Sequence, residues 1–328
     1  MKKLPLSVRI TALILGGILV AIGLVWTVEK FIFASFFFKG AKTETAIPGL
    51  WSGFVPQGFD KVDEDFYLIS GYNKDGESPS VIYTVKDGKK TAYELYDSDG
   101  KAYLSHAGGV THFGKYVYIA NDTGYDTTYC DMFLLSDLTD GDNKATKVDS
   151  FAVPNRLAYC SVYDGKMYTG AFYRDGSQYL TPESHHLTTP CGDKNTALTF
   201  VYTLSELTGK PISGTPERVF STLSNVQGMC FTDSGKVVLS TSWGLSASHL
   251  YVYDMEKTKE SLIDLNGIKT PVTYLDSEAL AQEIKCPPMS EELVYENGRV
   301  VILTESACMK YMFGKVMSGN FMHSFPVA

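Results

Sequence analysis

Five short apolar segments of the chain carry a polar side chain at or near their start. These residues are Gln57, His106, Tyr159, Gln227 and Glu292. If the segments are equivalent strands of one repeated architecture, the five side chains converge on a single site although they lie far apart in sequence. Packing alone would favour small or apolar residues there, so the recurrence indicates a ligand-binding site. The alternative is that these groups only satisfy neighbouring backbone groups.

Two more carboxylates, Asp122 and Glu305, follow the second apolar run of their segments. With Glu292 they make three acids. Glycosidases that are built as five-bladed β-propellers use three acids in the central channel of the ring. Glycosidases hold two carboxyl groups roughly 5 to 9 Å apart, one of them protonated. The same three carboxylates, with the side-chain carbonyls of Gln57 and Gln227, would also suit Ca²⁺, which prefers oxygen ligands. Hydrolysis by Asp122, Glu292 and Glu305 and a Ca²⁺ site are therefore alternatives to simple binding.

The stretch from Asn225 to Asp254 shows the elements that would position these residues. Val226 to Phe231 is a short apolar run, and a Thr-Asp-Ser-Gly turn follows it. Lys236 to Ser242 is rich in β-branched residues, and Leu250 to Tyr253 alternates with the period of a strand. Three consecutive strands of this kind are the profile of a β-propeller blade.

Looser copies of this stretch fill the chain after Phe54, and they predict an all-β, five-bladed β-propeller. They begin near Val55, His106, Ala158, Asn225 and Ser290. Each copy spans roughly 55 residues, above the usual ~40 to 50 of propeller repeats. Closure into a ring would bury both faces of every sheet and remove the exposed edges. A six-bladed ring with one degenerate blade and a two-sheet sandwich are the alternatives.

Two insertions account for the excess length. They are Tyr173 to Asn195 and Lys269 to Met289, and we expect them to rim one face, because binding segments often lie on loops of a rigid scaffold. Within the second insertion, Ser277 to Ile284 is predicted as a short helix. In the fifth copy, Lys310 to Val316 is predicted as a strand.

The repeat resembles the NHL and YVTN type of propeller repeat. The resemblance rests on Gln227-Gly228, Asp233-Ser234-Gly235, Val237 to Ser240 and Leu250 to Tyr253, with weaker echoes at Gln57-Gly58 and Gly108-Gly109. It implies a propeller architecture and no particular chemistry.

The N-terminal segment predicts a membrane anchor. Ile10 to Val28 is uncharged and apolar, and about 19 residues at 1.5 Å each cross a ~30 Å hydrocarbon core. Lys2, Lys3 and Arg9 precede it, which places the N-terminus in the cytoplasm by the positive-inside rule. A cleaved signal peptide is the alternative, but the run is long for one and no clear cleavage site follows.

The predicted organisation is therefore a cytoplasmic N-terminus (residues 1–9), an anchor (10–28), a juxtamembrane connector (29–53) and an extracytoplasmic propeller (54–328). Such a protein would be a single-pass protein of the cell membrane. We expect it to bind a glycan, a peptide or an envelope protein at the mouth of the channel.

Charge and cysteine content limit the other classes of function. The net charge of −8 argues against a nucleic-acid partner, which requires clustered Lys and Arg. The six cysteines show no Cys-x-x-Cys pair that would indicate zinc. In an exported domain they could form disulfides, or stay reduced as small buried hydrophobes, as the apolar surroundings of Cys160 and Cys230 favour.

Overall fold

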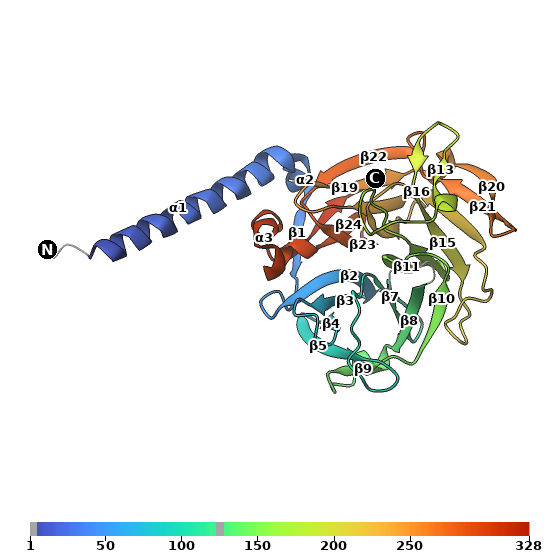
Figure 1. Cartoon of the computed structure of the whole chain (residues 1–328), viewed down its shortest axis with the longest axis horizontal. Helices are drawn as coiled ribbons and strands as arrows, with labels where there is room; N and C mark the ends of the chain where they lie inside the picture. The colour runs from blue at the N-terminus through green and yellow to red at the C-terminus, as the bar shows by residue number, and fades with distance from the viewer. Residues whose placement is uncertain (1–4, 123–127, 328) are drawn as a thin grey trace.

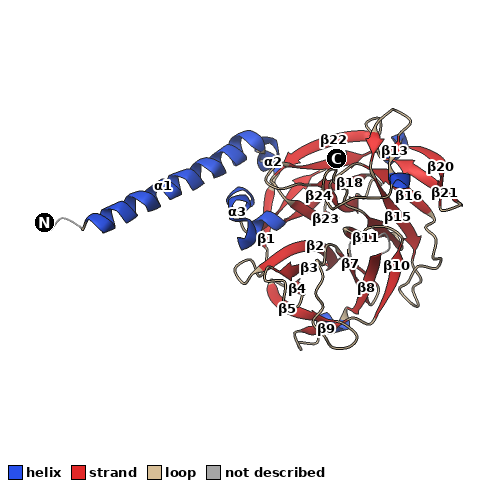
Figure 2. Cartoon of the chain, viewed as in Figure 1, coloured by secondary structure: helices blue, strands red, loops and turns tan. Residues whose placement is uncertain are grey.

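The computed structural model confirms a five-bladed β-propeller with an apolar helix at the N-terminus (Figure 1). The structure describes residues 5–122 and 128–327, so Lys2 and Lys3 of the predicted cytoplasmic segment lie outside the described residues. Strands make up almost all of the ring, and the α-helices gather on the side where the N-terminal segment joins it (Figure 2).

Each blade is a four-stranded antiparallel sheet. Blade 1 contains β2 (Phe54–Asp63), β3 (Phe66–Asn73), β4 (Val81–Lys86) and β5 (Lys89–Tyr96). Blade 2 contains β6 (Val110–Phe113), β7 (Tyr116–Asn121), β8 (Thr128–Leu134) and β10 (Asp149–Val153). Blade 3 contains β11 (Tyr159–Tyr163), β12 (Lys166–Gly170), β15 (Ala197–Thr203) and β16 (Arg218–Thr222). Blade 4 contains β17 (Val226–Phe231), β18 (Val237–Thr241), β19 (Ser248–Tyr253) and β22 (Leu280–Cys286). Blade 5 contains β23 (Ser290–Glu296), β24 (Arg299–Thr304), β25 (Phe321–Pro326) and β1 (Lys42–Ala46).

Shorter elements extend the blades or connect them. Strand β9 (Lys144–Thr146) pairs in parallel with β5, and the hairpin of β20 (Lys259–Leu265) and β21 (Ile268–Tyr274) extends blade 3 beyond β16. A small hairpin of β13 (Leu187–Thr188) and β14 (Lys194–Asn195) lies in the first insertion. Single 3-10 turns cover Ser136–Leu138, Glu183–His185, Met255–Lys257, Glu305–Ala307 and Met309–Tyr311.

The ring closes through its five innermost strands. Strands β2, β6, β11, β17 and β23 pack in that order, and β23 packs against β2. Five apolar clusters fill the five gaps between neighbouring blades, so every sheet buries both of its faces. Each cluster combines side chains of two neighbouring blades, for example Leu68 and Val117, Met132 and Leu198, Val201 and Met229, Val238 and Val300, or Val55 and Leu303.

The N-terminal and C-terminal parts of the chain meet in blade 5. Strand β1 pairs antiparallel with β25, so part of the segment that the sequence assigns to a connector is the outermost strand of this blade. Helix α2 (Ser35–Gly40) packs beside it, with the Phe37 ring stacked on Phe325 at 5.4 Å between centroids. The Arg299 guanidinium donates hydrogen bonds to the carbonyl oxygens of Gly40 and Ser324 and so joins three segments.

Two local predictions are wrong. The predicted helix at Ser277 to Ile284 is largely strand β22, which pairs with β19 and buries Ile284 and Cys286. Ala, Glu and Gln favour a helix in isolation, but the open edge of β19 outweighs this weak preference. The predicted strand at Lys310 to Val316 is mostly helix α3 (Met312–Ser318).

The N-terminal helix stands apart from the ring. Helix α1 (Leu6–Val28) continues into a π-helical turn (Glu29–Phe33), and no residue of α1 is buried. Among the described residues, Leu6–Phe33 is the one helix long and apolar enough to cross a membrane. Figure 1 shows it projecting from the ring beside α3. The six cysteines of the described chain are all free, and only Cys191 is not buried.

Candidate functional site

A cavity of about 690 Å³ lies where the blades meet at one end of the ring. The starts of the innermost strands supply part of its lining, and the segments that follow the second strands supply another part. The first insertion adds Gln178 and Tyr179. The lining therefore combines side chains from all five blades. Its charged, amide, imidazole and aromatic members include Gln57, His106, Asp122, Arg156, Phe172, Tyr179, Gln227, Trp243, Glu291 and Glu305.

The structure brings five of the predicted site residues together. Gln57, His106, Asp122, Gln227 and Glu305 all line the cavity. They converge because each lies at or before an innermost strand or directly after a second strand, as the repeat predicts. Two predicted residues lie elsewhere and are described next.

Tyr159 and Glu292 do not line the cavity. Tyr159 is fully buried, and its hydroxyl lies 2.6 Å from Thr199 Oγ1 within blade 3. Its neighbour Ala158 reaches the cavity instead.

Glu292 lies deeper, where the innermost strands approach one another. Its carboxylate Oε2 accepts hydrogen bonds from the backbone N–H groups of Phe59, at 2.9 Å, and Val110, at 2.8 Å. These groups belong to β2 and β6, so one side chain joins three blades. A Cβ on Gly228 would lie 2.7 Å from Glu292 Cα, which explains a glycine at that place in the repeat. Burial raises the pKa of this carboxyl well above its ordinary value.

Glu291 takes the place in the cavity that the sequence assigns to Glu292. Strand β23 contains an irregularity between Ser290 and Leu293, which shifts the alternation of its side chains. Glu291 is 3% exposed, and its Oε1 accepts a hydrogen bond from Gln227 Nε2 at 3.3 Å. Burial, and then the nearby Glu305 carboxyl, raise the pKa of Glu291 well above its ordinary value.

Glu305 is the second acid of this wall. The Tyr72 hydroxyl donates to its Oε1 at 3.4 Å, and Lys310 Nζ donates to that same hydroxyl. Burial raises the pKa of Glu305 to about 7, although the Lys310 charge opposes the change. A carboxyl group with this pKa is divided between its neutral and ionised forms near pH 7. We refer to Glu291 and Glu305 as the acid pair.

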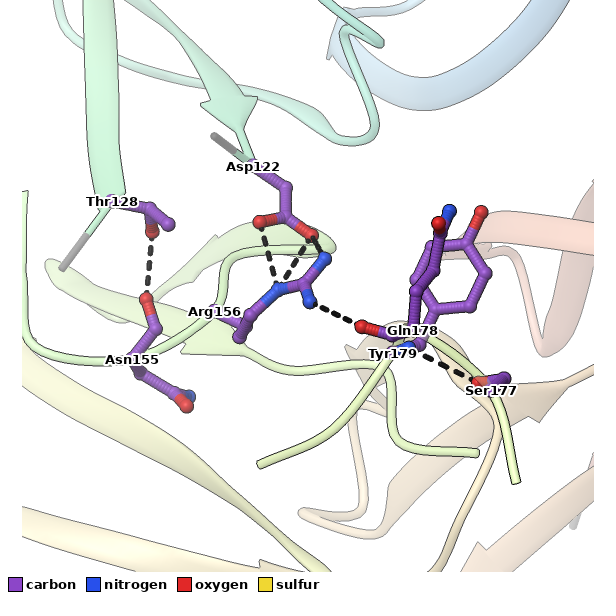
Figure 3. A network of polar contacts seen from close by, with 7 residues as sticks. All are labelled: Asp122, Thr128, Asn155, Arg156, Ser177, Gln178 and Tyr179. Atoms are coloured by element: carbon purple, nitrogen blue, oxygen red, sulfur yellow. Dashed lines mark hydrogen bonds and ion pairs between the residues drawn. The ribbon is translucent and has the colours of Figure 1, made fainter. Parts of the chain in front are cut away.

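Asp122 and Arg156, which also line the cavity, form an ion pair (Figure 3). Arg156 Nη2 lies 2.6 Å from Asp122 Oδ2, and its Nε lies 3.0 Å from Oδ1. The same guanidinium donates through Nη1 to the carbonyl oxygen of Gln178, which ties the first insertion to blade 2. Asp122 and Arg156 therefore neutralise each other at the rim of the cavity.

Phe172, Tyr179 and Trp243 form an aromatic wall. Tyr179 and Trp243 meet edge to face with ring centroids 6.4 Å apart, and the Phe172 ring lies 6.1 Å from that of Trp243. The Arg174 guanidinium lies over the Trp243 ring, 4.0 Å from its centroid. The Trp243 side of the wall therefore already carries one cation–π contact.

His106 contributes no positive charge near pH 7. Burial, followed by the Lys310 charge, lowers its pKa to about 4. Its imidazole stacks on the Tyr72 ring, with 4.7 Å between centroids. The cavity therefore combines a neutral imidazole, a neutralised ion pair and two weakly acidic carboxyl groups.

The three acids considered for Ca²⁺ or hydrolysis are not gathered into one group. Asp122 pairs with Arg156, Glu292 is held by backbone amides, and Glu305 bonds to Tyr72. The described residues contain no group of three or more His, Cys, Asp or Glu side chains placed to hold a metal ion. The donor set does not fit Ca²⁺, which requires six to eight oxygen ligands.

Sequence reasoning missed Phe172, Trp243, Arg156 and Glu291. A signal for the first two was present, because both follow the second strand of a blade, as Asp122 and Glu305 do. Examining the residues that follow the second strand of every blade would have identified Phe172 and Trp243. Arg156 lies in a loop between blades and has no such signal.

Comparison with known proteins adds likenesses of fold alone. No protein-family model matches the chain. No curated protein matches it in sequence. The PQQ-bound aldose sugar dehydrogenase of Streptomyces coelicolor is 12% identical, with a TM-score of 0.47, covering 88% of this chain and 98% of that one. The glutaminyl cyclase of Myxococcus xanthus is 7% identical, with a TM-score of 0.43 and coverage of 88% and 95%.

A structure of a nidogen/laminin complex is 11% identical, with a TM-score of 0.37 and coverage of 77% and 73%. These values carry no argument about activity, and the propeller itself is established by its strand pairing.

Proposed function

We propose that this protein is a single-pass membrane protein whose extracytoplasmic propeller binds a small polar ligand in the cavity. The observation that carries the proposal is the convergence of polar and aromatic side chains from five blades on one cavity of about 690 Å³. Ligand sites in proteins are concave, and they combine apolar walls with a few well-placed polar groups. The resemblance to NHL and YVTN repeats agrees with a binding role and adds no chemistry.

The lining favours a glycan or a peptide segment as the ligand. Amide groups of Gln57 and Gln227 both donate and accept hydrogen bonds, and the aromatic wall offers flat apolar surface. An envelope protein could present such a segment, with Gln178 and Tyr179 of the first insertion contacting it at the rim.

Binding is tested with the full-length protein in detergent micelles against a panel of oligosaccharides and short peptides. Trp243→Phe should weaken binding of a hit roughly 3- to 10-fold, because it reduces the aromatic wall. Trp51→Phe is the matched control, since Trp51 is 72% exposed and does not line the cavity. Equal affinities for the two variants would contradict a site in the cavity.

The orientation in the membrane is a separate part of the proposal. Its support is the basic cluster of Lys2, Lys3 and Arg9 ahead of the apolar helix. Protease treatment of intact cells should remove a tag at the C-terminus and spare one at the N-terminus. The opposite pattern would place the cavity in the cytoplasm.

Hydrolysis is the second candidate, and the acid pair favours it. Glu305, with a pKa of about 7, could act as a general acid beside Glu291, whereas Glu292 is outside the cavity. For a hydrolase, Glu305→Gln should abolish turnover and keep ligand affinity. A pure binding protein has no turnover with any ligand that it retains.

A further inference from the structure

We propose that the acid pair receives a positively charged nitrogen of the ligand, a primary ammonium or a guanidinium, while the aromatic wall holds the adjoining apolar part. This inference rests on the proposed function, because it names the ligand class of the same cavity. It follows from four features of the described residues, taken in turn.

First, no charged side chain among the described residues is in direct contact with the acid pair. Glu291 Oε1 receives one long hydrogen bond from Gln227, and its Oε2 has no hydrogen-bond partner among the described residues. Glu305 Oε1 receives one long bond from Tyr72, and hydrogen bonding by Gln57 and Tyr311 also lowers the pKa of this carboxyl group. Neither carboxyl group takes part in a salt bridge within the described parts of the chain. A buried carboxyl group that lacks partners is costly when ionised, so a cationic ligand would relieve that cost.

Second, Lys310, the cation whose charge acts on Glu305, lies against aromatic rings. Lys310 Nζ lies 4.9 Å from the Tyr72 ring centroid and 5.1 Å from that of Tyr311, and it donates to the Tyr72 hydroxyl. Lys310 opposes the rise in the Glu305 pKa without removing it. The surroundings of this wall therefore accommodate an ammonium group against aromatic rings.

Third, among the described residues that line the cavity, no other cation compensates the charge of the acid pair. Arg156 is neutralised by Asp122, and His106 is neutral near pH 7. The remaining groups that influence Glu291 are Glu292 and the Cys308 thiol, and both disfavour its ionised form. The described lining therefore offers two carboxyl groups to a cation and no uncompensated cation to an anion.

Fourth, the aromatic wall suits the apolar part of such a ligand. Trp243 is 41% exposed although it contacts Arg174, so part of its surface remains open. Amines and guanidinium groups gain from aromatic faces as well as from carboxylates. A ligand with a cationic nitrogen and an adjoining flat group matches both walls.

A cation would displace the proton of a neutral carboxyl group, and this distinguishes the inference from simple polar binding. The ammonium enters with its charge, the Glu305 or Glu291 O–H bond breaks, and one proton passes to the solvent. A neutral ligand would leave the protons in place. Proton release therefore distinguishes a cationic ligand from a neutral one. Because binding releases a proton, the affinity for the cationic ligand should increase as the pH rises.

The test compares benzylamine with benzyl alcohol, which has the same shape and no charge. Titration calorimetry of the full-length protein in detergent, at about pH 6.5 in two buffers of different ionisation enthalpy, measures both affinity and released protons. We expect benzylamine to bind roughly tenfold or more tightly than benzyl alcohol, and to release close to one proton. Benzyl alcohol should release none.

Variants identify the acid pair as the source of the proton. Glu291→Gln and Glu305→Gln should each reduce the preference for benzylamine, and together they should abolish both the preference and the proton release. Glu278→Gln, at an exposed glutamate outside the cavity, is the charge-matched control and should behave as the wild type. Melting temperatures confirm that each variant is folded.

Each other outcome is decisive. Equal affinity for the two probes without proton release overturns the inference, and the proposed function stands. If neither probe binds a protein that does bind a neutral glycan of the panel, the inference fails alone. If nothing binds in the cavity, the inference and the proposed function both fail.

Discussion

Glu291 and Glu292 are neighbours in sequence, yet only Glu291 lines the cavity, while Glu292 accepts hydrogen bonds from the backbone of two other blades. The pleat of β23 and its irregularity at this point turn the two carboxyl groups to different surroundings. One acid is therefore available to a ligand, and the other stabilises the centre of the ring.

The folded protein should tolerate Glu292→Gln far better than Glu292→Ala. Burial raises the pKa of Glu292 well above its ordinary value, so the surroundings disfavour the ionised carboxylate and suit a neutral group. Glu292→Gln keeps an oxygen for the two N–H groups and should be as stable as the wild type, or more so. Glu292→Ala strands both N–H groups and leaves a cavity, so the free energy of unfolding should fall by about 2–4 kcal/mol. Urea unfolding measures both changes.

Stability should fall as the pH rises from about 5 toward neutrality. Glu291 and Glu292 have raised pKa values, and the pKa of Glu305 is about 7. When folding raises the pKa of an acid, the contribution of that group to the stability of the folded protein is complete below the pKa of the unfolded state. This contribution is lost as the pH rises toward the pKa of the folded state. Each such carboxyl group lowers the free energy of unfolding by up to about 1.4 kcal/mol per pH unit in that window.

This pH dependence is checked by unfolding the wild type and Glu291→Gln between about pH 5 and 7. The variant lacks one titrating carboxyl group, so its stability should fall less steeply, while the contributions of the histidines cancel in the comparison. If the free energy of unfolding fell equally steeply with pH in the two proteins, Glu291 would be ionised in the folded protein.

Phe37 should matter to the propeller although it precedes the first blade in sequence. Its side chain is 1% exposed and stacks on Phe325, whereas Phe36 is 60% exposed. Phe37→Ala should lower the free energy of unfolding by about 3 kcal/mol or more, and Phe36→Ala should cost much less. A similar small loss for both would mean that α2 is only a linker.

The architecture was predictable because blades repeat. The turns and alternating strands around Val226 to Tyr253 recur along the chain, and ring closure is the arrangement that buries both faces of every copy. For the same reason Gln57, His106 and Gln227 could be placed at one site from their positions in the repeat.

The remaining features depend on tertiary structure that local sequence does not encode. The irregularity in β23 exchanges Glu292 for Glu291, and the alternation of Ser290 to Val294 gives no sign of it. Strand β1 becomes part of blade 5 only because β25 offers an open edge. Arg156 reaches the cavity from a loop whose course is set by the packing of blades 2 and 3.

The ion pair of Asp122 and Arg156 should stabilise both the rim and the first insertion. Only 11% of the Arg156 side chain is exposed, so Asp122→Asn would leave a largely buried guanidinium without its counter-charge. We expect the free energy of unfolding to fall by about 1–3 kcal/mol. Because Arg156 also bonds to the Gln178 carbonyl, amide hydrogen exchange should quicken in the first insertion. Asp99→Asn is the control, since the pair of Asp99 with Lys101 is about three-quarters exposed and such pairs contribute little. Equal effects of the two substitutions, or unchanged exchange in the insertion, would show that the ion pair does not organise this side of the cavity.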